Sequence, residues 1–304
     1  MSSVWPRCIR FVAQEDDKTY YGVPQEEGDL GLLYWNGQRI TARVLSASPL
    51  SPHTTLSSRT LTVKQLLSPL APSEVTAIRG LGLQYPVDSS KPVTKPDVPV
   101  LFLKPQSSLV GPGDEIFIPR LARGEKNDYE VELCVVIGRD CRNVKAEEAM
   151  DYVLGYTVAD DVTSRGLGAK GLQWGMGKAF DTWQPIGPCL VSPSSLKKDP
   201  HDLSISTHLN GQLVQEGSTR NLVIQLPELI SRLSHGANLQ AGSIILTGSP
   251  LAIGRSAPGD LTDSSPFLSH CDEVRCFVEG IGTLVNTVRE EGATAKPGHV
   301  KSKL

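Results

Sequence analysis

Residues 128–137, which read DYEVELCVVI, place two acidic residues directly ahead of an unbroken apolar run. Glu130 and Glu132 are two positions apart, so in an extended strand their side chains point to the same face of the sheet. Residues 133–137 are rich in valine and isoleucine, which is typical of a buried strand. The sequence therefore predicts a pair of carboxylates at the edge of a hydrophobic core.

Two carboxylates this close repel each other unless a cation neutralises them. A hard divalent metal with oxygen ligands would do so, which makes a metal site one interpretation of the pair. The alternative is a solvated strand face, on which alternating acidic residues are common. Further ligands elsewhere in the chain are needed to choose between the two.

The composition indicates a mainly β protein of the α+β class. The 304 residues suit one large domain with a small companion, or two domains. The 28 glycines and 22 prolines favour turns and short strands over a helical bundle. The net charge of -3 gives no reason to expect nucleic acid as a partner, and no apolar run has membrane-spanning length. The six cysteines lack C-x-x-C spacing and are expected to be reduced thiols.

Changes in composition along the chain predict three parts. Residues 1–70 are expected to form a small β-rich domain, which ends after a Ser/Pro/Thr-rich stretch. Residues 71–292 are expected to form the catalytic domain, with short strands separated by Gly or Pro and a clear helix starting at Pro227. Residues 293–304 are expected to form a flexible polar tail.

The tail ends in Ser302, Lys303 and Leu304, the tripeptide that the peroxisomal import receptor reads. A peroxisomal location is therefore expected. The alternative is a coincidental polar end and a cytoplasmic protein.

Three further stretches contain residues that could bind a metal or a substrate. Asp160 and Asp161 end an apolar strand, and two or three carboxylates with a shell completed by water and substrate suit Mg²⁺, with Mn²⁺ or Ca²⁺ as substitutes. Lys178 lies between small and apolar neighbours and could bind a substrate carboxylate or enolate if it is buried; the alternative is a surface lysine. Thr247 and Gly248 offer a hydroxyl and a tight turn after an apolar strand, which can bring backbone N–H groups close to an anion, although alone this is only a turn.

Taken together, these stretches resemble the fumarylacetoacetate hydrolase superfamily over residues 77–288, in its acylpyruvate hydrolase and oxaloacetate decarboxylase-like branch. The matches, in the order found in the family, are YEVELCVVIG, DDVTSR, GKAFDTWQPIGP, ILTGSP and EGIGTLVNTV.

The resemblance implies a metal site of Glu130, Glu132 and Asp161, which Arg165 supports. It implies that Lys178, Thr247 and Gly248 contact a small keto acid substrate, with Lys178 and Arg165 as catalytic residues. It also implies a mixed β-sandwich roll that dimerises, and Mg²⁺ as the cofactor.

Two departures from the family pattern affect the expected reaction. Asp88 stands where hydrolytic members carry a water-activating His, and Lys91 stands near the position of its partner Glu, so Asp88 is the candidate general base. Gly166 and Gly168 replace a family Asp and Gln, which removes polar side chains and should enlarge the substrate pocket or loosen its hold on the substrate.

The family default predicts hydrolysis of a C–C bond in an acylpyruvate-like or other β-diketo acid. Loss of the water-activating pair favours an alternative, decarboxylation of a β-keto acid or keto-enol isomerisation, for which stabilising an enolate suffices. A second alternative is a catalytically degenerate protein that keeps the fold.

Overall fold

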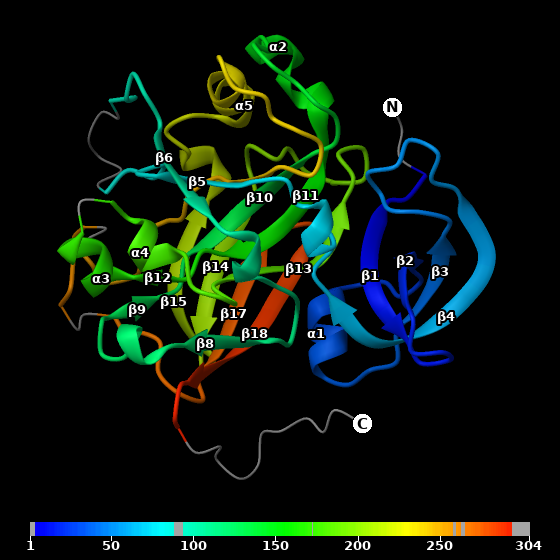
Figure 1. The fold of residues 1–304 in the computed structure, drawn as a ribbon, viewed down its shortest axis with the longest axis horizontal. Coiled ribbons are helices and arrows are strands. Elements are labelled where there is room, and N and C mark those ends of the chain that lie inside the picture. The colour runs from blue at the N-terminus through cyan, green and yellow to red at the C-terminus, as the bar shows by residue number, and fades with distance from the viewer. Residues whose placement is uncertain (1–3, 88–93, 172, 258–259, 263–264, 294–304) are drawn as a thin grey trace.

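A computed structural model describes residues 4–87, 94–171, 173–257, 260–262 and 265–293. The protein is mainly β, as the composition predicts (Figure 1). The largest sheet has eleven strands in the order β2-β3-β4-β1-β13-β11-β10-β16-β5-β6, with β7 beside β13. These strands are β1 (Arg7–Ala13), β2 (Thr19–Pro24), β3 (Thr41–Leu45), β4 (Leu56–Leu67), β5 (Ile78–Gly82), β6 (Val100–Lys104), β7 (Leu109–Val110), β10 (Val131–Ile137), β11 (Val153–Asp160), β13 (Gln184–Val191) and β16 (Ile244–Leu246).

A second sheet packs against the central strands of the first. Its order is β15-β14-β17-β18-β8, formed by β15 (Gln212–Ser218), β14 (Ser204–Leu209), β17 (Glu273–Val278), β18 (Gly282–Glu290) and β8 (Glu115–Ile118). A separate short pair joins β9 (Asn127–Asp128) to β12 (Thr163–Ser164).

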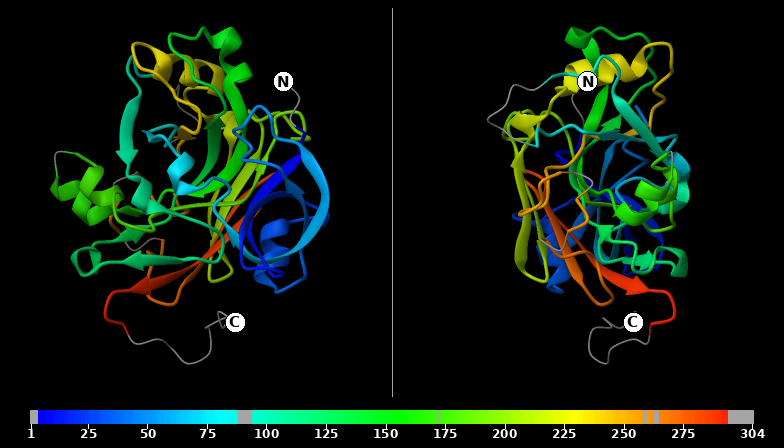
Figure 2. Two further views of the ribbon diagram at one scale, coloured as in Figure 1. Left: turned by 45° about the vertical axis from the view of Figure 1, so that its right-hand side comes forward. Right: turned by 90° about the vertical axis from the view of Figure 1, so that its left-hand side faces the viewer.

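The helices are short. They are α1 (Leu30–Trp35), α2 (Ala146–Ala149), α3 (Arg165–Lys170), α4 (Gly175–Lys178) and α5 (Leu226–Ser234). Helix α5 begins next to Pro227, as expected, and packs with α2 at one end of the molecule, which is uppermost in both views of Figure 2. No helix in the described part of the chain is long and apolar enough to cross a membrane.

The first four strands close on themselves. Each of β1 to β4 pairs with two of the others, because β1 pairs with both β2 and β4 while β3 joins β2 to β4. The resulting small barrel joins the rest of the molecule where β1 pairs with β13 (Figure 1).

Strand β10 lies at the centre of the fold and is covered on both faces. Leu133, Val135 and Ile137 face one hydrophobic cluster, whereas Cys134 and Val136 face another. A strand buried on both sides needs apolar residues at every position, which explains the unbroken run. The face of Cys134 and Val136 is also the face of Glu130 and Glu132, four and two positions before Cys134.

Candidate metal centre and substrate cavity

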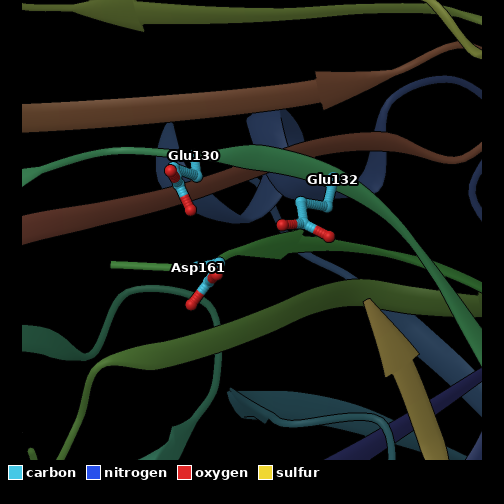
Figure 3. Close-up of side chains that lie close together, drawn as sticks. All are labelled: Glu130, Glu132 and Asp161. Carbon is cyan, nitrogen blue, oxygen red and sulfur yellow. The ribbon is translucent and has the colours of Figure 1, made fainter. Parts of the chain in front are cut away.

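Strand pairing brings three acidic residues together. Strand β10 runs antiparallel to β11, with Glu132 opposite Ala159. Asp161 follows the end of β11, and its N–H donates to the carbonyl oxygen of Glu130 at 2.9 Å. Glu130, Glu132 and Asp161 are buried, and each offers a carboxylate oxygen within 4.8 Å of the others. Figure 3 shows the three side chains converging from the two neighbouring strands.

The surroundings of Glu130 and Glu132 shift the pKa values of the two side chains in opposite directions. Burial, together with the negative charges of Asp161 and Glu130, raises the pKa of Glu132 well above its usual value. Burial would also raise the pKa of Glu130, but the positive charges of Arg165 and Lys178 outweigh it and lower that pKa. Glu132 is therefore the member of the triad whose negative charge lacks direct compensation from a basic side chain.

Lys178 lies among the carboxylates, which excludes the surface-lysine alternative. Its Nζ donates to Glu130 Oε2 at 2.9 Å and to Thr163 Oγ1 at 2.8 Å, and it contacts Asp161. The Nζ also lies 4.2 Å from the centre of the Phe102 ring. Burial would lower the pKa of Lys178, but the charges of Asp161 and Glu130 raise it, so the group is an ammonium fixed beside the triad.

A second buried lysine, Lys104, was not among the site residues predicted from the sequence. Its Nζ contacts the Asp161 carboxylate and donates to the carbonyl oxygens of Trp183 at 2.6 Å and Val162 at 3.2 Å. The available signal was the alternation within β6, where Phe102 and Lys104 share the buried face. Burial lowers the pKa of Lys104, and the charge of Asp161 only partly offsets this effect.

Arg165 supports the site, as the resemblance implies. Its Nη2 lies 2.5 Å from Glu130 Oε1 and 2.8 Å from Asp128 Oδ2, and its Nε donates to the same Asp128 oxygen at 2.8 Å. Asp128 also contacts Arg255, another buried residue that the sequence analysis did not select. Glu130 is thus held at one end of a row of alternating charges that runs through Arg165 and Asp128 to Arg255.

Asp160 is buried beside the triad, but its carboxylate accepts a hydrogen bond from the backbone. One carboxylate oxygen accepts the N–H of Glu130 at 2.8 Å, and burial raises the pKa of the side chain to about 7. Asp160 therefore fixes the backbone at Glu130, whereas Asp161 offers a carboxylate oxygen to the candidate metal site.

Thr247 and Gly248 both form hydrogen bonds with residues of strand β10. The Thr247 hydroxyl donates to the carbonyl oxygen of Leu133 at 2.9 Å, and Thr247 is not among the residues that line the cavity. The Thr247 hydroxyl proton is thus engaged by β10, and the contact of Thr247 with the substrate stays a prediction. The N–H of Gly248 donates a hydrogen bond to the Glu132 carboxylate, so the anion at this turn belongs to the protein itself.

The donor set fits a hard divalent cation. It consists of three carboxylates, with no His or Cys in this group of described residues. Burial and the charges of Asp161 and Glu130 raise the pKa of Glu132, and a cation beside the three carboxylates would offset this repulsion. Glu130, Glu132 and Asp161 would hold the ion.

Two members of the triad, Glu130 and Glu132, line a cavity of about 220 Å³. Glu130, Glu132 and Lys178 contribute polar groups to its wall. Much of the remaining wall is apolar or small and comprises Leu81, Gly82, Leu83, Tyr85, Phe102, Gly168, Ala169, Trp174, Gly177, Pro250, Leu251, Ala252 and Ala257. A polar floor with apolar walls is the usual form of a small-molecule site.

Two glycines of β5 make room for the aromatic part of this wall. A Cβ on Gly80 would lie 2.0 Å from the Phe102 ring, and one on Gly82 would lie 2.3 Å from Trp174. The two rings contact each other with their centroids 6.1 Å apart. Small residues in the strand therefore set the width of the cavity.

The two glycines that follow Arg165 differ in their effect. Gly168 lines the cavity, and a Cβ there would meet nothing within 4 Å, in agreement with the predicted enlargement. A Cβ on Gly166 would instead lie 2.4 Å from Glu125. Gly166 thus allows close packing against Glu125 and does not enlarge the pocket, which corrects the sequence-based prediction for this residue.

Some candidates lie outside the described residues. They are the candidate general base Asp88, its neighbour Lys91, and the terminal Ser302, Lys303 and Leu304. No histidine is found among the described residues that line the cavity.

The family model for the C-terminal domain of fumarylacetoacetate (FAA) hydrolase matches residues 78–289. The chain belongs to the fumarylacetoacetate hydrolase family. The matched residues include the triad, both buried lysines and the cavity wall.

Curated members of the family differ in their reactions. The chain is 38% identical to the caffeoylpyruvate hydrolase of Neonothopanus nambi over 98% of its own length and 99% of that protein's. It is 41% identical to the human mitochondrial oxaloacetate tautomerase FAHD2A over 68% of its own length and 65% of that protein's.

Solved structures of the family have the same fold. The 2-hydroxyhepta-2,4-diene-1,7-dioate isomerase from Mycobacterium marinum superposes with a TM-score of 0.76 at 29% identity, covering 94% of this chain and 99% of that one. The 5-carboxymethyl-2-hydroxymuconate delta-isomerase from Mycobacterium smegmatis gives 0.75 at 28% identity, covering 94% of this chain and all of the other. The predicted family and fold are confirmed, and the protein belongs to a family of hydrolases, tautomerases and isomerases.

Proposed function

We propose that the protein hydrolyses a C–C bond in an acylpyruvate with the help of a divalent cation, Mg²⁺ by preference, held by Glu130, Glu132 and Asp161. The observation that carries the proposal is the buried triad of carboxylates, two of which line a cavity with a partly apolar wall, with the Lys178 ammonium beside it. Mn²⁺ and Ca²⁺ offer the same preference for oxygen ligands and are expected to substitute.

The charges of the site suit an anionic substrate. Asp128, Glu130 and Asp161 form ion pairs with Lys104, Lys178, Arg165 and Arg255, whereas Glu132 and Asp160, whose pKa values burial raises, form no ion pair among the described residues. A divalent cation adds two positive charges to this set. An acylpyruvate carries a carboxylate and develops enolate charge as the C–C bond breaks, and these two negative charges complement the surplus.

The reaction transfers the elements of water across the bond between the acyl carbonyl carbon and the methylene of the pyruvoyl group. The acyl carbon gains the oxygen, and the departing methylene gains a proton to become the methyl group of pyruvate. When bound, the cation supplies Lewis acidity to the substrate's carbonyl oxygens.

The chain's own residues orient the reactants. Lys178 offers a fixed ammonium for the substrate carboxylate or the developing enolate oxygen, because its Nζ is anchored by Glu130 and Asp161. Arg165 fixes the Glu130 carboxylate. The apolar wall around Phe102 and Trp174 excludes water from the acyl group. Asp88 is proposed as the base that takes a proton from the attacking water.

The curated relatives catalyse different types of reaction. The caffeoylpyruvate hydrolase matches nearly the whole chain, including the N-terminal barrel, which supports hydrolysis of an acylpyruvate. Keto-enol isomerisation is the second candidate, since the described cavity wall contains no histidine and the oxaloacetate tautomerase is 41% identical over 68% of this chain.

One assay separates the candidates. Purified protein with Mg²⁺ or Mn²⁺ is offered acetylpyruvate and oxaloacetate, and the products are followed by proton NMR. Pyruvate and acetate from acetylpyruvate support the proposal. Faster enol-to-keto conversion of oxaloacetate without acetylpyruvate cleavage supports the isomerase, and pyruvate with carbon dioxide indicates a decarboxylase. Turnover of neither substrate, with metal binding unchanged in Glu130→Gln, refutes the metal-site assignment.

A further inference from the structure

Helix α4 carries Lys178 to the acidic triad but has little stability of its own. It is a single turn, Gly175–Lys178, with the sequence GMGK and no side-chain cap. Each glycine costs about 1 kcal/mol relative to alanine in a helix, and an isolated turn is shorter than a stable helix requires. Contacts outside the helix therefore fix its position. Met176 contributes little to them, because it is 60% exposed.

The last residue of α4 is held by the triad itself. Lys178 donates hydrogen bonds to Glu130 and Thr163 and contacts Asp161. Glu130 and Asp161 are also two of the three carboxylates that would hold the cation. They would then serve the ammonium and the ion together, so a second anchor on α4 would keep the ammonium in place when the cation binds.

Trp174 supplies such an anchor at the start of α4. Its carbonyl oxygen accepts the N–H of Gly177 at 2.8 Å, which forms the turn. Its indole lies against strand β5, because a Cβ on Gly82 would lie 2.3 Å from the ring. The indole also packs on the Phe102 ring, with the two centroids 6.1 Å apart. Trp174 thus connects the start of α4 to the neighbouring strands β5 and β6.

Phe102 contacts both ends of this helix. The Lys178 Nζ lies 4.2 Å from the centre of the Phe102 ring, on which Trp174 also packs. The turn between the two ends is closely packed, since a Cβ on Gly177 would lie 2.8 Å from the carbonyl oxygen of Ser164. A displacement of Trp174 would therefore move Lys178, four positions later in the same turn.

We infer that Trp174 is a positioning residue, which fixes α4 and thereby the Lys178 ammonium beside the triad. The inference rests on the proposed function, because it concerns the placement of a group that acts in that reaction. A misplacement of about 1 Å can cost roughly a hundred-fold in rate. Trp174 also lines the cavity, so its effect on Lys178 has to be separated from direct contact with the acyl group.

The test measures kcat and KM for acetylpyruvate, whose small acyl group limits direct contact with the indole. Trp174→Ala should lower kcat by roughly ten-fold or more and change KM less, with Mn²⁺ binding in calorimetry unchanged. Trp174→Phe keeps a ring against Gly82 and Phe102 and should retain most of kcat. Met176→Ala, at an exposed side chain of the same helix, is the matched control and should keep the wild-type kcat.

A double variant shows whether Trp174 acts through Lys178. In a Lys178→Met background, Trp174→Ala should lower kcat no further, because the group that Trp174 positions is gone. A loss by the same factor in both backgrounds would overturn the inference, as would an unchanged kcat in Trp174→Ala or an equal loss in Met176→Ala. If Trp174→Ala does not fold, Trp174→Leu takes its place in each comparison.

Amide hydrogen exchange separates this inference from the proposed function. If the wild type cleaves no acylpyruvate, the proposed function fails, but exchange measured by mass spectrometry in the presence of Mg²⁺ still reports on the stability of α4. Faster exchange over residues 174–178 in Trp174→Ala than in Met176→Ala supports the anchor at Trp174, and equal rates refute it.

Discussion

Replacing Lys104 with methionine tests whether the buried charges around Asp161 form one interdependent set. The Lys104 ammonium is fully buried and contacts Asp161 and two backbone carbonyl oxygens. Methionine preserves most of the side-chain volume, so the change removes the charge and the hydrogen bonds with little loss of packing.

The expected cost follows from the burial of both partners. Removing one member of a buried ion pair leaves an uncompensated charge and typically costs about 3–5 kcal/mol. Lys178 still contacts Asp161 in the variant, which places the expectation at the lower end, about 3 kcal/mol. This is a large fraction of the roughly 5–15 kcal/mol by which a domain is stable.

Urea denaturation followed by tryptophan fluorescence measures the free energy of unfolding. Lys95→Met is the matched control, because Lys95 pairs with Glu228 at 2.7 Å while 51% of its side chain is exposed. An exposed pair of this kind is worth about 1 kcal/mol or less. A loss below about 1 kcal/mol in Lys104→Met, equal to that of the control, would refute the view that Lys104 compensates a buried Asp161 charge.

Three further predictions concern the metal centre and its neighbours. Glu132→Gln should weaken Mn²⁺ binding in calorimetry by roughly ten-fold or more, because it removes one of three carboxylate ligands; unchanged binding would exclude Glu132 as a ligand. Lys178→Met should lower kcat for acetylpyruvate by roughly a hundred-fold if its ammonium stabilises the enolate, and a change in KM alone would contradict that role. Gly248→Ala should destabilise by about 1–3 kcal/mol, since its φ is +92° and its Cβ would lie 2.5 Å from that of Gln84; Gly124→Ala, with a φ of +74° and nothing within 4 Å, should cost less in the same denaturation experiment.

Local patterns pointed to the acidic residues, and the family resemblance selected the triad among them. The two-residue spacing of Glu130 and Glu132 determines that they share a face in any strand, and the apolar run after them determines that the strand is buried. Asp160 and Asp161 both stand at the end of the apolar strand β11, and only the resemblance selected Asp161. The shared face and the burial depend on a few neighbouring residues, which is why the sequence alone supports them.

Tertiary contacts decided the surroundings of the triad. In β6 the sequence VLFLK exposes Leu101 and Leu103 and buries Lys104, the reverse of what hydrophobicity suggests. Lys104 contacts Asp161, which is 57 positions away in the sequence, and Arg255 contacts Asp128, which is 127 positions away. No local pattern contains such a pairing, because it depends on which strands and loops the whole sheet brings side by side.

The sequence by itself determined the family and the mainly β class, and it named the three acidic residues that could hold a metal. Only the tertiary structure decided that Thr247 bonds to β10 and that Gly166 packs against Glu125 while Gly168 faces the cavity. The physical reason is that residue type sets what a side chain can do, whereas the packing of distant segments sets which groups it meets.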